Sequence, residues 1–246
     1  MPVLIACNSV LRVGVPKDSQ SKTKAQVAGG IVAGPMFVLA FTAIGARRQG
    51  YDWHRHAVSS LAAGDRGWQQ RANFIVAGVL YSSAALGLGR CSRQSVAPHI
   101  VPSLVAGVGV GLIGSGVFVT DPVSGFPRTR GKHGSGKSSP AEITLSREGK
   151  LHNICAIPIF AGIPVAGLAS ALVAARRREY HWACLSAGSS LAMVGSFLLF
   201  GAAFGHESRL AGKGGVFQRI SVASGFGWLT VLSLRALSSL RRSQRD

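Results

Sequence analysis

A carboxylate, an imidazole and a guanidinium lie at the ends of apolar segments of this chain. Asp121 follows one apolar segment, His152 begins the next and Arg219 begins the last. Because imidazole titrates near neutrality and a carboxylate can orient it, Asp121 and His152 could handle a proton together. A guanidinium at the edge of a hydrocarbon layer must reach the headgroups or find a partner, and Asp121 or Glu207 could pair with Arg219.

A phosphate-binding motif occurs between these segments, without the surroundings that such a motif requires. Gly131, Gly136, Lys137 and Ser138 have the spacing G-x-x-x-x-G-K-S. In nucleotide-binding proteins a strand precedes this loop and a helix follows it. Here polar residues and prolines lie on both sides. We interpret the stretch as a solvated loop rich in glycine, serine and lysine, not as a nucleotide site.

The remaining patterns predict no cofactor, no metal and no catalytic residue. Gly109, Gly111 and Gly114 fit G-x-G-x-x-G, but no strand precedes them and no acidic residue follows about 20 positions later. Glycines inside an apolar segment more often let helices pack closely. The histidines form no H-x-x-x-H or H-E-x-x-H pair, and the four cysteines form no C-x-x-C pair. We expect the cysteines to be small buried residues.

The composition is that of a membrane protein. Of 246 residues, 47% are hydrophobic and only 15% are charged, whereas a soluble domain has about 25% charged residues. The net charge of +18 could indicate nucleic acid binding, but no basic domain or reader module lies between the apolar segments. Lys and Arg beside membrane spans attract anionic lipid headgroups. We therefore expect the lipid bilayer as partner, including its anionic headgroups, and no nucleic acid.

Six apolar segments predict an all-α, polytopic membrane protein with a bundle of six transmembrane helices. Each segment is close to the roughly 20 residues that cross a hydrocarbon core of about 30 Å. The expected spans are residues 25–46, 72–89, 97–120, 151–175, 181–205 and 216–238, within a membrane domain of residues 25–240. Residues 1–24 are expected to be a disordered basic tail, and residues 241–246 a basic C-terminal tail. Gly30 with Gly34, and Gly201 with Gly205, are expected at helix contacts.

An even number of spans places both ends of the chain on one side of the membrane and gathers polar residues on the other. The candidate polar site there consists of Tyr51, Asp52, Ser60, Asn73, Asp121, His152, Gln218 and Arg219. Each residue alone has an ordinary interpretation as a helix cap, a turn residue or a headgroup contact. Their convergence predicts that Asp121, His152 and Arg219 approach one another, with Asn73 and Gln218 nearby.

The orientation is not decided by charge counting, because the two sides carry nearly equal numbers of Lys and Arg. Dense basic clusters at residues 176–178 and 241–242 lie directly beside spans. On that basis we expect a multi-pass protein of the cell membrane whose termini lie in the cytoplasm.

Short motifs at the ends of the spans resemble a known family. They are Gly50-Tyr51-Asp52, Ser59-Ser60-Leu61, Gly67-Trp68 with Asn73-Phe74 and Gly78, Phe118 with Asp121-Pro122, His152, and Gly215 with Gln218-Arg219 and Trp228. In order and placement they are similar to the bacterial and archaeal domain of unknown function 998, over about residues 25–240. The resemblance implies a six-span integral membrane protein, distantly similar to the Frag1/DRAM/Sfk1 group, with no established reaction. The long basic loop between Asp121 and His152 departs from the family pattern.

These observations favour a protein without catalytic activity that binds lipid or a small molecule at the polar site. The alternative is a membrane enzyme or transporter that uses Asp121 and His152 as a proton-handling pair at the membrane surface. Transporters more usually carry charge at mid-membrane, where these spans have almost none.

The six-span topology predicts that reporter domains fused along the chain alternate between two compartments. The fusion points are Gln70, Ser95, Ser139, Glu179, Lys213 and the C-terminus. Alkaline phosphatase and fluorescent reporters at each point measure the compartment directly. Two consecutive fusions that report the same side would contradict the topology.

Overall fold

The computed structural model describes residues 17–91, 99–122, 125–127, 145–203, 209–210 and 212–242. Within these ranges the chain forms helices and no strand. The helices are α1 (Lys17–Ala46), the short 3-10 helix η2 (Ser59–Ala62), α2 (Trp68–Cys91), α3 (Ile100–Val117), α4 (Arg147–Phe160), α5 (Gly162–Arg176), α6 (Tyr180–Ala202) and α7 (Gly214–Arg242). Because α4 and α5 follow one another as a single crossing, six segments are long and apolar enough to span a membrane. The all-α, six-span prediction is confirmed.

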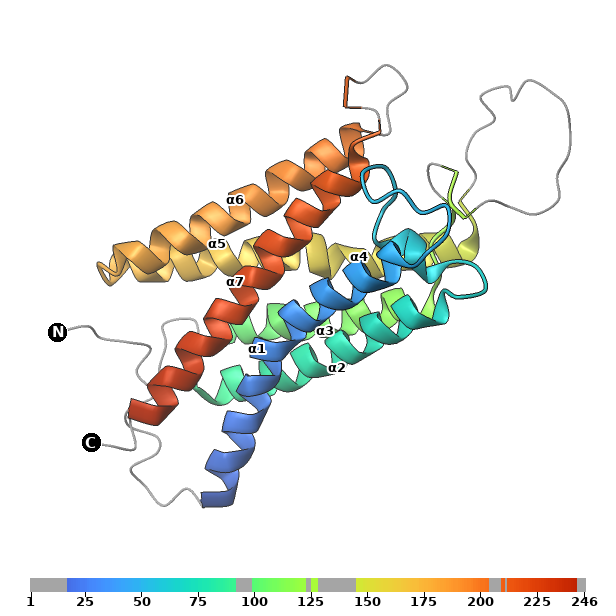
Figure 1. Cartoon of the computed structure of the whole chain (residues 1–246). Helices are drawn as coiled ribbons and strands as arrows, with labels where there is room; N and C mark the ends of the chain where they lie inside the picture. Colours follow the sequence, from blue (N-terminus) through green and yellow to red (C-terminus); the bar gives the residue numbers. More distant parts are fainter. Residues whose placement is uncertain are drawn as a thin grey trace, which may run out of the picture.

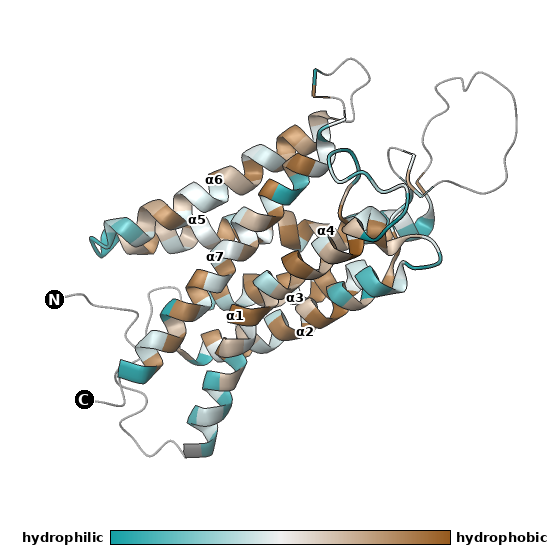
Figure 2. Ribbon diagram, viewed as in Figure 1, coloured by the Kyte–Doolittle hydropathy of each residue, from teal (hydrophilic) through white to brown (hydrophobic). Residues whose placement is uncertain are grey.

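The helices form a bundle with two distinct ends (Figure 1). At one end, which we call the terminal face, α1 begins, α7 ends and α5 turns into α6. The other end, which we call the connector face, carries the described connector residues 47–67, 118–122, 125–127, 145–146, 209–210 and 212–213. There the backbone N–H of Val216 donates to the carbonyl of His54 at 3.2 Å, and the rings of Tyr51 and Phe126 lie 5.2 Å apart. The middle of the bundle is hydrophobic and its ends are hydrophilic (Figure 2).

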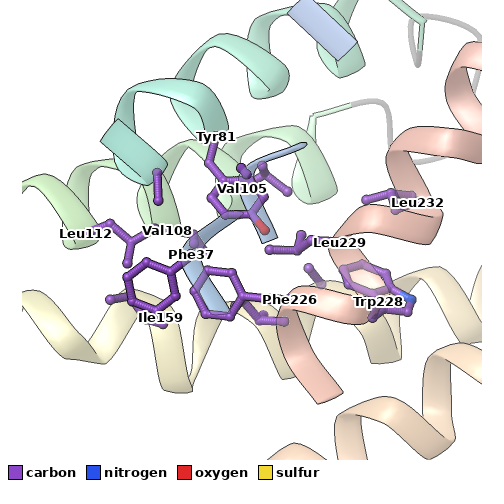
Figure 3. Close-up of a cluster of buried hydrophobic side chains, with 14 of the residues drawn as sticks. Phe37, Tyr81, Val105, Val108, Leu112, Ile159, Phe226, Trp228, Leu229 and Leu232 are labelled. Atoms are coloured by element: carbon purple, nitrogen blue, oxygen red, sulfur yellow. The ribbon is translucent and has the colours of Figure 1, made fainter. Parts of the chain in front are cut away.

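An aromatic cluster on α1, α2 and α7 forms the core near the connector face. The ring of Phe37 lies 5.2 Å from the rings of both Phe74 and Phe226, and Figure 3 shows Phe37 beside Phe226. Tyr81 and Phe226 are also neighbours, with ring centroids 5.5 Å apart. Such rings bury large apolar areas in preferred tilted or offset arrangements. The cluster therefore fixes how α1, α2 and α7 pack together.

Glycines bring the backbones of α2 and α3 into contact. A Cβ added to Gly78 would lie 2.6 Å from the carbonyl oxygen of Gly109, and a Cβ on Gly109 would lie 2.8 Å from that of Gly78. On the other side of the third span, a Cβ on Gly111 would lie 2.5 Å from the carbonyl of Cys155. The G-x-G-x-x-G pattern is thus a packing surface of α3.

The two predicted pairs of contact glycines have different outcomes. Gly30 and Gly34 face α7, where a Cβ on Gly34 would lie 2.9 Å from the carbonyl oxygen of Phe226. For the described part of the chain the prediction for Gly201 is wrong, because no described atom lies within 4 Å of a Cβ placed there. Gly205 lies outside the described residues.

Several helices begin earlier than the apolar segments suggest. Helix α1 begins at Lys17, so the part of the predicted tail from Lys17 to residue 24 is helical, with Asp18 in its first turn. An acidic residue in the first turn stabilises the helix, because its negative charge lies near the positive end of the helix dipole. Helix α2 begins at Trp68, ahead of the expected start at residue 72. Hydropathy marks only the apolar part of each helix, whereas polar turns extend the helix beyond the hydrocarbon. Residues 1–16 and 243–246 lie outside the described residues.

The fourth span begins with a capped polar turn and is broken in the middle. The Ser146 side chain accepts a hydrogen bond from the Gly149 backbone N–H at 3.0 Å, as an N-cap does. Helix α4 contains Pro158 and ends at Phe160, and α5 begins at Gly162. Proline supplies no backbone N–H and disrupts the preceding turn. The phosphate-loop-like residues 131–138 lie outside the described residues.

Cysteine burial agrees only in part with the sequence prediction. Cys91 is buried, Cys155 is half-buried and Cys184 is exposed, and all three are free thiols. The prediction is wrong for Cys184 because its side of α6 faces outward, where a bilayer would cover it. Cys7 lies outside the described residues.

An ion pair joins two helices at the terminal face. Arg235 of α7 pairs with Glu179, which precedes α6. The Arg235 guanidinium also lies 5.0 Å from the ring of Trp182. Because both charged side chains are mostly buried, the pair and the ring tie the end of α7 to the start of α6.

Replacing Gly78 with alanine is expected to lower the free energy of unfolding by about 1–3 kcal/mol, as overpacking does in tightly packed cores. The added methyl would approach the α3 backbone at Gly109, which has no flexible side chain to move aside. Thermal unfolding in lipid nanodiscs measures the effect.

The matched control is Gly188→Ala in α6, where a Cβ would meet no atom of the described residues within 4 Å. We expect it to leave stability unchanged or slightly raised, since alanine favours helix more than glycine does. Equal melting of both variants would contradict the close approach of α2 and α3.

Candidate functional site

Arg219, in the second turn of α7, holds the first connector against the helix. One terminal nitrogen of its guanidinium donates to the carbonyls of Trp53 at 2.7 Å, Gly215 at 2.9 Å and His56 at 3.3 Å. The other donates to the Tyr51 hydroxyl at 2.7 Å. The guanidinium thereby binds two connector carbonyls and the Tyr51 hydroxyl at the edge of the bundle, where backbone acceptors need partners. The expected pairing of Arg219 with Asp121 is not found, and Glu207 lies outside the described residues.

Close approach at Gly215 makes this arrangement possible. A Cβ on Gly215 would lie 2.6 Å from the carbonyl oxygen of His56 and 3.0 Å from the Arg219 guanidinium. The first connector therefore rests directly on the backbone of α7. One turn along, the Gln218 side-chain oxygen accepts a hydrogen bond from the Val58 backbone N–H at 2.6 Å. Two consecutive polar residues of α7, Gln218 and Arg219, thus bind the same connector.

Tyr51 and Asp52 shape the connector itself. The Tyr51 hydroxyl lies 3.0 Å from the carbonyl of Ala57, to which it donates. The Asp52 carboxylate accepts from the His54 backbone N–H at 2.9 Å, and the Asp52 backbone N–H donates to the Nδ1 atom of His56 at 2.8 Å. Burial raises the pKa of the Tyr51 phenol, and the Arg219 charge partly offsets that rise. The hydroxyl is therefore a proton donor at neutral pH, and both residues are built into a turn.

Asn73 of α2 and Ser60 of the connector's short helix η2 are both buried. The Asn73 amide donates to the Phe37 carbonyl of α1 at 3.1 Å and to the Gln70 side-chain oxygen at 3.3 Å. Asn73 therefore lies within α2 and does not cap it, contrary to its ordinary interpretation. The Ser60 hydroxyl is fully buried and has no hydrogen-bond partner within the described part of the chain.

Asp121 and His152 lie at the start of the fourth span, and each has its own partner. The Asp121 carboxylate accepts from the Ser146 backbone N–H at 2.9 Å. The His152 Nδ1 atom lies 2.9 Å from the Phe118 carbonyl. Since a carbonyl only accepts, Nδ1 carries the proton and, in the neutral ring, Nε2 remains an acceptor. The two side chains thus anchor α4 to the end of α3.

Two of the predicted residues, His152 and Gln218, line one cavity. Among the described residues, no hydrogen bond or ion pair joins any two of Asp121, His152 and Arg219. The cavity has a volume of about 290 Å³ and lies between α1, α2, α3, α4, α6 and α7. Its deeper walls are apolar and include Phe37, Phe74 and Phe226.

Polar side chains of Ser115, His152 and Gln218 are among those that line the cavity. The Ser115 side chain is 1% exposed, and its hydroxyl has no partner among the described residues. His152 is 5% exposed and lines the cavity, and with Nδ1 donating to Phe118 its neutral ring has Nε2 as the acceptor atom. The Gln218 oxygen is occupied by Val58, which leaves the amide N–H groups of that side chain as donors. The arrangement suits a polar head that both donates and accepts hydrogen bonds.

Sequence reasoning missed Ser115, Gln70 and Ser146. Ser146 had a signal, because a serine followed by an acidic residue in the next turn is typical of a helix N-terminus. Ser115 had none, since small residues recur throughout the third span. In the described part of the chain, no three side chains of His, Cys, Asp or Glu are placed to hold a metal ion.

Six membrane-length helices, apolar at mid-bundle and polar at the ends, define a multi-pass membrane protein. The family described as "Protein of unknown function (DUF998)" matches residues 31–235, which is most of the chain. The protein belongs to this family, as the motifs at the ends of its spans predict. Comparison with curated proteins and with solved structures gave no match. The distant similarity to the Frag1/DRAM/Sfk1 group stays a prediction.

Arg219→Lys is expected to loosen the connector face. A lysine has a single ammonium group, whereas the two terminal nitrogens of the Arg219 guanidinium donate to the Tyr51 hydroxyl and to the connector carbonyls at the same time. The loss should be about 2 kcal/mol in the free energy of unfolding, the scale of a charged hydrogen bond. Thermal unfolding and limited proteolysis of the first connector measure it.

Arg66→Lys, on the exposed part of the same connector, is the matched control and should behave as the parent does. If both variants melt and are cleaved alike, the guanidinium of Arg219 does not hold the connector.

Proposed function

We propose that this protein binds an uncharged membrane amphiphile in the cavity at the connector face and does not transform it. The observation that carries the proposal is the pairing of an apolar interior with the polar side chains of Ser115, His152 and Gln218, of which the Ser115 hydroxyl has no partner among the described residues. At about 290 Å³, the cavity is near the lower end of the range for small-molecule sites. It therefore suits the head and first carbons of a single-chain ligand.

The chemistry of the lining favours an uncharged head. The described residues around the cavity include no Asp, Glu, Lys or Arg. Arg219, which follows the lining residue Gln218, already donates to four oxygen atoms. Burying an anion beside neutral groups alone would be costly. A hydroxyl, amide or protonated acid could accept from Ser115 and Gln218 and donate to His152.

The second candidate is a membrane enzyme or transporter that uses Asp121 and His152 as a proton-handling pair. It would need the carboxylate to orient the imidazole. The Phe118 carbonyl occupies that orienting position, and the Asp121 carboxylate is engaged by Ser146. These contacts favour binding over proton transfer.

We further propose a place in the cell membrane with the termini in the cytoplasm. Basic residues at 176–178 and 241–242 lie at the terminal face, where they could contact anionic headgroups. Nucleic acid is not proposed as a partner, and the oligomeric state is left open. Reporter fusions at the two ends test the orientation.

We expect the protein to retain a bound amphiphile when it is extracted with its surrounding lipid and purified. The fraction of this amphiphile in the purified sample should exceed its fraction in the bulk membrane lipid. Mass spectrometry identifies the bound molecule. His152→Ala and Ser115→Ala should each lower its occupancy by about fivefold to tenfold, the effect of one lost hydrogen bond. The molecule should be chemically unchanged in the parent and in both variants.

Ser103→Ala is the control, because Ser103 is exposed on the same helix as Ser115. Absence of any enriched amphiphile would overturn the proposal. A molecule that the parent converts, and that Asp121→Asn and His152→Ala leave intact, would establish the second candidate instead.

A further inference from the structure

A second hollow lies on the outside of the bundle, along α4, α5 and α6. Its volume is about 560 Å³, and Asn153 is its one polar lining residue. Ile157, Val165 and Leu168 line it and are 60%, 51% and 46% exposed. Exposed apolar side chains in the middle of a membrane span face lipid. We call this hollow the lateral groove.

The lateral groove adjoins the interior cavity. Asn153, Ala156, Phe160 and Phe197 line both spaces. The rings of Phe160 on α4 and Phe197 on α6 are stacked, with centroids 4.2 Å apart. These two rings stand between the cavity and the groove, and rotation of aromatic side chains is a small motion on a short timescale.

The helices on either side of this boundary separate toward the connector face. Figure 1 shows α6 and α5 together at the terminal face, and α6 and α4 apart at the other end. Contacts between α4 and α6 are slight, whereas α5 packs along α6. The break between α4 and α5, at Ala161, lies where the two helices begin to separate.

We propose that the bound amphiphile enters from the bilayer between α4 and α6, and that its alkyl chain lies in the lateral groove while its head occupies the cavity. This inference rests on the proposed function. It adds the place where the alkyl chain of the ligand binds and the route by which the ligand enters. From Asn153 to Leu168 the helices run about 22 Å, which is most of a hydrocarbon core of about 30 Å. The groove is therefore long enough for an alkyl chain that continues from the head toward mid-membrane.

The continuity of the groove with the cavity favours a single alkyl chain over a second copy of the protein. Four residues, Asn153, Ala156, Phe160 and Phe197, line both spaces. One flexible chain can therefore extend from a head in the cavity into the groove. The polar end of the groove, at Asn153, is also the end that adjoins the cavity.

The test uses two long-chain alkanols in nanodiscs, one with a diazirine beside the hydroxyl carbon and one with a diazirine at the far end of the chain. After photolysis, mass spectrometry locates the labelled peptides. The first probe should label peptides that line the cavity, and the second should label the α5 and α6 peptides that carry Leu168 and Val194. Ala156→Phe, which fills the junction, should lower labelling by the second probe about tenfold, equivalent to 1.4 kcal/mol.

Leu168→Trp provides a second variant at an exposed position of the groove and should also lower labelling by the far-end probe. Leu191→Trp, 66% exposed on α6 and outside the groove, is its control. Cavity labelling by both probes, with none in the groove, would overturn this inference and leave the proposed function standing. Uniform labelling of all lipid-facing helices, unchanged in His152→Ala, would overturn both. Crosslinking of Val165→Cys between two copies, with the groove unlabelled, would assign the groove to a second copy.

Discussion

The contact between Arg219 and the first connector is the interaction on which the connector face depends. A loop at the edge of a membrane bundle carries carbonyl groups that neither helix nor bulk water fully satisfies. Arg219 donates to two of them, those of Trp53 and His56, and to the Tyr51 hydroxyl, while Gly215 allows the loop to reach the α7 backbone. With the loop fixed, the Val58 backbone can bind Gln218, which forms one wall of the cavity. The cavity thus depends on a guanidinium that does not line it.

Other arginines act in the same way. Arg48 donates to the carbonyl of Ala63 at 2.6 Å, and Arg71 donates to that of Gly116 at 3.0 Å, at the C-terminal end of α3. A cation at the C-terminal end of a helix donates to carbonyls that have no partner within the helix, and its charge stabilises the negative end of the helix dipole. Burial lowers the pKa of Arg48, which is consistent with a charge drawn into the protein surface. A part of the basic excess is therefore structural, and it explains why a net charge of +18 does not require a nucleic acid partner.

The cavity and the groove share one physical origin. Close glycine contacts hold α2 against α3, and aromatic rings hold α1 against α7, so that part of the bundle is tightly packed. The fourth span is different, because its prolines and the break at Ala161 prevent one straight helix from packing along α6. Space remains between α4 and α6, and the rings of Phe160 and Phe197 fill only part of it. A binding site arises where regular helix packing is interrupted.

The sequence by itself determined the class, the number of spans and the end of the bundle where the polar residues gather, because hydrophobic length and span parity are properties of the chain alone. It also identified the family, through short motifs at the span ends. Only the tertiary structure decided which groups the polar side chains bind by hydrogen bonds. Arg219 binds carbonyls and not Asp121, and His152 is oriented by Phe118, because hydrogen bonds depend on where loops fold back. Ser115 resembles every other small residue of its span until packing leaves its hydroxyl beside a cavity.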